Sequence, residues 1–227
     1  MYFSKICIKN EAFHSGLMRN EPMSLYNEHA FIWNLFPYDA QANRDFLYRR
    51  FEVKDSLQYY VLSTRKPIEH PIQYEIETKP YTPIINHGES LRFSLRVNPV
   101  VTKKIEGAGS KKRKREDIYM DALAKNKQLP ESERLPNSVL LNSCALDWLE
   151  QRAKSNGFAA SREEVIVEGY RRFEMRKKRG TDKITFGAVD FTGILTVTNK
   201  ELFSRVLQQG LGKSKAFGCG LLLIRRL

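Results

Sequence analysis

The order of strands and helices along the sequence predicts an α+β protein with two tandem ferredoxin-like (RRM-like) units of order βαββαβ. Residues 91–227 show all six elements in this order, and the first half repeats it with a degraded second helix. A chain of 227 residues with 41% hydrophobic residues can bury two cores. We place the domain boundary after residue 88, which gives an N-terminal domain of residues 1–88 and a C-terminal domain of residues 89–227.

The N-terminal unit begins with a strand, because side chains of residues 2–9 alternate between an apolar and a mixed face. Ser24 can cap a helix that runs to residue 36 and is ended by Pro37. The remaining expected elements are a short helical piece over residues 45–51 and strands over residues 57–64 and 73–78.

The C-terminal unit starts with strict apolar–polar alternation over residues 91–97, which predicts a strand. The basic, glycine-containing segment that follows, up to Arg115, is predicted to be a flexible excursion. Thr198-Asn199-Lys200-Glu201 has the pattern of a capping box and opens a helix. The expected elements are a helix over 137–155, a hairpin of strands over 164–177 and 183–198, a helix over 200–209 and a final strand from residue 221.

Positive charge is concentrated in two short stretches of the chain. The net charge is +12, of which residues 101–115 carry +6 and residues 171–183 carry +5. Localised positive charge indicates a polyanionic partner, most commonly a nucleic acid. A solvated face or a disordered basic tail is the alternative interpretation.

The second basic stretch lies on the predicted hairpin. A two-stranded ribbon that carries cations can follow the phosphates of a nucleic acid, although a charged edge that prevents sheet-to-sheet aggregation has the same composition. The candidate RNA-binding side chains are those of Arg171, Arg172, Arg176, Lys177, Lys178, Arg179 and Lys183.

A glycine-rich loop precedes the final strand. Its glycines allow the backbone to approach a ligand closely, and free N–H groups beside lysines form an anion-binding concavity. The spacing is not that of a Walker loop. A helix C-cap followed by a hairpin turn would use the same glycines. The candidate residues are Gly210, Gly212, Gly218 and Gly220 with Lys213 and Lys215.

Tyr26 and His29 are three residues apart in the first predicted helix and therefore share one helix face. Histidine can give or take a proton near neutral pH. RNA carries its own nucleophile, the 2′-hydroxyl, so its cleavage needs positioning, proton transfer and charge stabilisation, but no metal. The alternative is that His29 is an ordinary, partly buried histidine beside Trp33.

The cysteines and histidines show no metal-ligand spacing, so we expect neither a metal nor another cofactor. Cys7, Cys144 and Cys219 are odd in number and far apart, which favours free thiols in a reducing compartment. The N-terminus lacks the apolar core of a signal peptide, and no apolar run reaches membrane-spanning length. We therefore expect a cytoplasmic protein with no membrane partner.

Several separated motifs together resemble the CasE-type endoribonucleases, the CRISPR RNA-processing subunits of the type I-E surveillance complex (Cascade). They occur in the family's order over essentially the whole chain, which makes the set far more specific than any single motif. The motifs are Met1-Tyr2-Phe3-Ser4-Lys5, Leu25-Tyr26-Asn27-Glu28-His29 with Trp33-Asn34-Leu35-Phe36-Pro37, Arg44-Asp45-Phe46-Leu47-Tyr48, Leu91-Arg92-Phe93-Ser94-Leu95-Arg96-Val97-Asn98-Pro99, Gly193-Ile194-Leu195-Thr196-Val197 and the glycine-rich loop.

The resemblance implies a metal-independent cut on the 3′ side of a repeat stem-loop. The 2′-hydroxyl attacks and leaves a 5′-hydroxyl and a 2′,3′-cyclic or 3′-phosphate end. His29 matches the family's catalytic histidine and Tyr26 its associated tyrosine, with the roles of acid and base left open. The basic hairpin falls in the family's stem-binding region. The implied partners are CRISPR repeat stem-loop RNA, retained as product, and the other subunits of the effector complex.

Three hypotheses follow from the sequence: a repeat-specific endoribonuclease, a non-catalytic RNA-binding subunit of the same fold, and a basic module for another polyanion. Cleavage of a stem-loop RNA in the presence of a chelator separates the first from the second. Competition between a stem-loop and a scrambled RNA exposes the third, because charge attraction alone is indifferent to shape.

Overall fold

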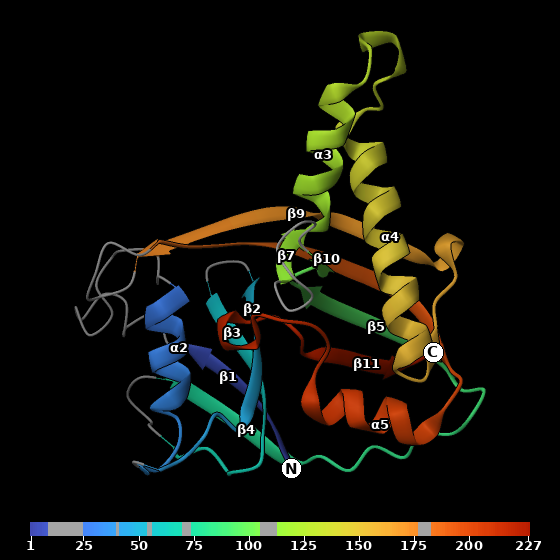
Figure 1. Cartoon of the computed structure of the whole chain (residues 1–227). Coiled ribbons are helices and arrows are strands. Elements are labelled where there is room, and N and C mark those ends of the chain that lie inside the picture. The colour runs from blue at the N-terminus through green and yellow to red at the C-terminus, as the bar shows by residue number, and fades with distance from the viewer. Residues whose placement is uncertain (9–24, 40, 54–55, 70–73, 105–112, 177–182) are drawn as a thin grey trace.

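The structure is a computed structural model, and it describes residues 1–8, 25–39, 41–53, 56–69, 74–104, 113–176 and 183–227. Two larger antiparallel sheets with separate helices make up most of it (Figure 1). Each helix-covered face buries a hydrophobic core, and the opposite faces of the sheets approach each other. We propose that the two sheets correspond to domains of residues 1–88 and 89–227.

The first sheet contains β1 (Tyr2–Ile8), β2 (Phe46–Val53), β3 (Ser56–Ser63) and β4 (Tyr74–Pro80) in the order β2-β3-β1-β4. Helix α2 (Leu25–Trp33) covers one face, where Ile32 packs against residues of β1 and β3. With the strands counted by their place in the unit, the order is 4-1-3-2, as expected for a ferredoxin-like unit.

The prediction of a helical piece over residues 45–51 is wrong, because these residues form β2. Phe46 and Tyr48 face the core under α2, while Leu47 packs against Leu221, the residue before the last strand of the other sheet, and Arg49 is also buried. Burial on both faces removes the alternation that marks a strand in a sequence.

Helix α2 ends three residues before the predicted end. The N–H groups of Leu35 and Phe36 bond to the carbonyls of Ile32 and Trp33, so the chain tightens into an i−3 turn before Pro37. The predicted cap, Ser24, lies outside the described residues.

The second sheet has the order β11-β5-β10-β8. Strand β9 pairs with the same edge of β10 as β8 does, but at an earlier part of β10. Helices α4 (Asn137–Ser155) and α5 (Lys200–Gln209) pack on one face, over a core that includes Leu95, Trp148 and Phe203. The four long strands of the unit are, in chain order, β5, β9, β10 and β11. Their order in the sheet, β11-β5-β10-β9, again reads 4-1-3-2, which confirms the predicted fold class. The strands are β5 (Ser90–Val97), β8 (Phe158–Ala159), β9 (Val165–Arg176), β10 (Lys183–Val197) and β11 (Leu222–Arg226).

The capping prediction for α5 is off by one residue: Asn199, not Thr198, is the N-cap, and its side chain accepts a bond of 2.9 Å from the Leu202 N–H. In the described part of this half, three 3₁₀ turns complete the connections. They are η1 (Glu131–Glu133), η2 (Arg162–Glu164) and η3 (Lys215–Phe217).

The predicted flexible excursion after β5 contains regular structure. β6 (Val100–Lys104) and β7 (Arg113–Asp117) form a two-stranded ribbon, and residues 105–112 lie outside the description. Helix α3 (Ile118–Gln128) follows; the sequence analysis missed it, although Asp117 is a regular N-cap that accepts the N–H groups of Tyr119 and Met120. Helices α3 and α4 stand side by side and project away from the sheets (Figure 1).

None of the helices in the described ranges combines the length and the apolarity that a membrane crossing needs.

Candidate functional site

His29 lies on α2 in a pocket of aromatic rings. Its Nε2 accepts a hydrogen bond of 3.0 Å from the Trp33 indole N–H, one helical turn away. The ring centroid is 5.9 Å from that of Phe46 on β2 and 6.3 Å from that of Phe217 in the glycine-rich loop. Elements from both sheets therefore meet at this histidine.

The environment of His29 favours its neutral form. Burial lowers the pKa of the ring and the Arg44 guanidinium lowers it further, against a smaller opposing effect of the Ala216 carbonyl. Because Nε2 accepts the indole N–H, the neutral ring carries its proton on Nδ1, which is buried near the Ala216 carbonyl but makes no hydrogen bond of regular geometry in the part of the chain described. Proton transfer with a substrate thus requires the Trp33 bond to be exchanged for one to that substrate.

Tyr26 and His29 are both on α2, in the helical register that the sequence predicted. Tyr26 lies in the first turn of the helix and is 43% exposed. The helix is anchored to β2 by Glu28, a fully buried carboxylate that accepts a hydrogen bond from Arg50. This ion pair holds the residue next to His29 against the sheet.

The glycine-rich loop connects α5 to β11 and reaches His29. Gly210 ends α5 with a positive φ of +73°, and a Cβ there would lie 2.8 Å from the Gly220 carbonyl oxygen. The predicted helix C-cap is therefore present, and the rest of the loop continues past it to the site. Its Ala216 carbonyl accepts a hydrogen bond of 3.1 Å from the Tyr48 hydroxyl, which fixes the loop over β2.

Three cations gather at this loop. Lys213 and Lys215 belong to it, and Arg44 reaches it from the residues before β2. Burial lowers the pKa of the Lys215 ammonium, and the charges of Arg44 and Lys213 lower it further. The Lys215 ammonium donates to the Gln209 carbonyl over 2.6 Å. Like charges placed beside a neutral histidine make a field that attracts a phosphate.

Sequence reasoning did not identify Arg44 as a site residue. It stands in a motif that resembles the CasE-type family, but no local pattern relates it to a loop more than 160 residues later. The only available signal was the motif itself.

The basic hairpin is connected to His29 through stacked rings. Phe173 of β9 stacks on Phe186 of β10 with centroids 5.2 Å apart, and Phe186 stacks on Phe217 at 5.6 Å. Phe217 is in turn next to His29. Figure 1 shows β9 and β10 as a long hairpin that runs across the molecule toward α2.

The structure describes only part of the predicted basic cluster. Arg171, Arg172 and Lys183 have exposed side chains, and Lys183 pairs with Glu174 on the neighbouring strand. Arg176 is the last residue of β9, paired in register with Lys183. Lys177, Lys178 and Arg179 lie outside the described residues.

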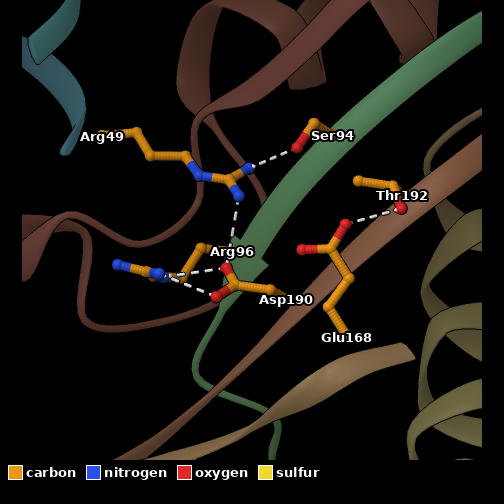
Figure 2. A network of polar contacts seen from close by, with 6 residues as sticks. All are labelled: Arg49, Ser94, Arg96, Glu168, Asp190 and Thr192. Carbon is orange, nitrogen blue, oxygen red and sulfur yellow. Dashed lines mark hydrogen bonds and ion pairs between the residues drawn. The ribbon is translucent and has the colours of Figure 1, made fainter. Parts of the chain in front are cut away.

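A second polar group joins the two sheets (Figure 2). Arg49 of β2, 4% exposed, donates to Ser94 of β5 over 2.9 Å and to Asp190 of β10 over 3.3 Å. Arg96 binds both oxygens of the same Asp190 carboxylate, at 2.8 and 2.7 Å. This network fixes the sheet that carries α2 against the sheet that carries the loop.

Over the described ranges, no three His, Cys, Asp or Glu side chains are placed to share a metal ion, and the three cysteines are free thiols.

Comparison with known proteins decides the family. The sequence matches the family described as CRISPR associated protein over residues 1–226. The chain belongs to this family. The resemblance to CasE-type proteins is thereby confirmed, and one relative is the Cascade subunit CasE of Escherichia coli K12, 29% identical over an alignment of 236 positions that covers all of both chains.

A second relative is the CRISPR-associated endoribonuclease Cse3 of Thermus thermophilus, 27% identical over 158 residues, which are 64% of this chain and 60% of Cse3. Solved structures share the fold. Endoribonuclease Cse3 bound to a 19-nucleotide RNA has a TM-score of 0.69 at 23% identity and covers 99% of this chain and 100% of Cse3. Cas6e from Escherichia coli K-12 has a TM-score of 0.57 at 23% identity, with both chains fully covered.

Proposed function

We propose that this chain is a metal-independent, repeat-specific endoribonuclease that cuts CRISPR precursor RNA on the 3′ side of the repeat stem-loop. It keeps the product bound and joins the type I-E effector complex in the cytoplasm. The observation that carries the proposal is the placement of a neutral histidine, His29, beside a glycine-rich loop with Lys215 and Arg44. A proton acceptor next to a phosphate site is what cleavage by a 2′-hydroxyl requires.

The relatives support the proposal through their names. The Escherichia coli relative is named as a Cascade subunit and the Thermus thermophilus relative as an endoribonuclease. Cse3, which shares the fold, is described with bound RNA, and another structure of this fold is a CRISPR RNA-guided surveillance complex.

In the proposed reaction the 2′-oxygen attacks the adjacent phosphorus and the bond from phosphorus to the 5′-oxygen breaks. The 2′-hydroxyl proton passes to a base and the 5′-oxygen takes up a proton, which leaves a 2′,3′-cyclic phosphate and a 5′-hydroxyl. His29 is the base we assign, because its lowered pKa keeps the ring neutral at pH 7. Lys215 and Arg44 stabilise the charge on the phosphate oxygens, and backbone N–H groups of the loop approach the phosphate closely.

Tyr26 is the second residue that we propose for the reaction. In this proposal its phenol either orients the substrate or protonates the leaving oxygen, and the 43% exposure of the residue is compatible with both roles. Tyr26→Phe distinguishes these roles: the rate falls as far as in His29→Ala if the phenol transfers a proton, and less if it only orients the substrate.

One observation favours a second candidate, a non-catalytic RNA-binding subunit: Nε2 of His29 is occupied by Trp33 and Nδ1 is buried. Single-turnover cleavage of a labelled repeat stem-loop in excess EDTA decides between the two. A cut at one position that yields a 5′-hydroxyl supports the endoribonuclease. Tight binding without any cut supports the second candidate.

A further inference from the structure

A cleft of about 340 Å³ opens between the two sheets beside α2. Its walls come from α2, β2, β5, β9, β10 and the glycine-rich loop, and the Arg49–Asp190–Arg96 network of Figure 2 lies on its surface. Phe217 belongs both to the wall of this cleft and to the ring cluster around His29, with centroids 6.3 Å apart. The cleft therefore adjoins the proposed site of cleavage.

The chemistry of the cleft differs from that of a phosphate site. Four arginines and four carboxylates line it, together with the rings of Phe51, Phe173 and Phe217. A site for the sugar–phosphate backbone presents an excess of cations. Arginines and carboxylates in equal number beside aromatic faces instead match a nucleobase, which stacks through its face and offers both donors and acceptors on its edges.

The cleft also has unused hydrogen-bonding capacity. The Nε atoms of Arg49 and Arg50 are buried and have no partner among the described residues. Only 4% of Arg49 is exposed, so water does not satisfy this donor. At the rim, the exposed Arg171 adds a guanidinium that makes no ion pair within the described ranges. The Arg171 guanidinium is therefore exposed to a ligand that enters the cleft.

We propose that the cleft binds the unpaired nucleobase immediately 3′ of the scissile phosphate. The inference rests on the proposed function. With the cut at the 3′ base of the stem, the nucleotide before the cut is held by the stem, and the nucleotide after it is free to leave the strand. A phosphate at His29 and Lys215 places this next base at Phe217, where the cleft begins.

The experiment changes the RNA and the protein separately. One RNA has the normal base 3′ of the cut and the other has an abasic nucleotide there. Each is cleaved by the wild type, by Arg171→Ala and by the matched control Arg172→Ala. Arg171 and Arg172 are consecutive exposed arginines of β9, but only Arg171 lines the cleft. Single-turnover rates at subsaturating protein give kcat/KM for each pair.

We expect the abasic RNA to lose about tenfold in kcat/KM with the wild type, the order of one stacked base. This loss should shrink in Arg171→Ala. Arg172→Ala should lower kcat/KM for both RNAs by the same factor, because loss of a general phosphate attraction does not depend on the base. In a non-cleavable RNA with a 2′-deoxy nucleotide before the cut, 2-aminopurine at the tested position should lose fluorescence on binding.

Equal kcat/KM for the two RNAs with the wild type, and unchanged 2-aminopurine fluorescence, would overturn the cleft assignment while the proposed cleavage stands. Binding without cleavage of either RNA would overturn the proposed function, and quenched 2-aminopurine would then still support the cleft as a nucleobase site. The comparison of two RNAs on the wild type does not depend on any variant folding, and circular dichroism checks the two arginine variants.

Discussion

Replacement of His29 by alanine is the sharpest test of the proposed site. The change removes a ring that lies between Phe46 and Phe217 and accepts one hydrogen bond from Trp33. Loss of that bond costs about 1 kcal/mol of unfolding free energy, which a domain of ordinary stability tolerates. The loss of a positioned base is larger: it lowers the cleavage rate by roughly 10²–10⁴-fold. At about 1.4 kcal/mol per factor of ten, the barrier rises by about 3–5 kcal/mol.

Binding should change little, since affinity comes from phosphate contacts of cations elsewhere on the surface. The assay is single-turnover cleavage of a labelled stem-loop in EDTA, with affinity measured in parallel by filter binding. His87→Ala is the matched control, because this histidine is exposed in the turn before β5, away from α2. A His29→Ala protein that cuts at the wild-type rate would refute the assignment of the active site. A loss of both rate and binding would show that His29 is structural.

Three further predictions test the surroundings of His29. Arg44→Ala removes a charge that lowers the pKa of His29, so this pKa should rise in the variant. The ring is then neutral only at higher pH, and the acidic limb of the pH–rate profile should move to higher pH. An unmoved limb would contradict the role of His29 as base. Gly218→Val places a branched side chain at a φ of +75° over the Tyr48 ring. The variant should lose about 1–3 kcal/mol of unfolding free energy and bind RNA more weakly. A melting temperature and an RNA affinity equal to those of the wild type would remove the loop from the proposal. Alanine substitution of four hairpin cations should lower the RNA affinity and make it less dependent on salt concentration, because fewer counterions are released on binding. An unchanged slope of log affinity against log salt concentration would show that the cluster does not touch RNA. These cations are Arg176, Lys177, Lys178 and Arg179.

Elements with one buried face were predictable from the sequence. The alternation of β5 and the amphipathic pattern of α5 record directly which side chains face the core. β2 was not predictable in this way, because it is buried by α2 on one side and by the second sheet on the other. The ribbon β6–β7 was missed for a different reason: its strands are rich in charge, and composition alone favoured a flexible segment.

For the site, the sequence predicted the candidate residues of two separate segments, a helix and a loop. It indicated His29 with Tyr26 on one helix, and glycines with lysines in one loop, because each set is local in the chain. That the two places meet was a consequence of the fold. Phe217 reaches His29 across 188 residues of sequence, and Arg49 fixes the sheets through an aspartate 141 residues away.

The sequence by itself therefore determined the family, the fold class and the candidate catalytic helix of this protein, because periodicity and motifs are properties of short segments. Only the tertiary structure decided that Arg44 and Lys215 lie near His29 and that a mixed-charge cleft lies beside it. These features depend on how the two sheets dock against each other. Docking is set by side chains on opposite surfaces, whose pairing leaves no periodic trace along the chain.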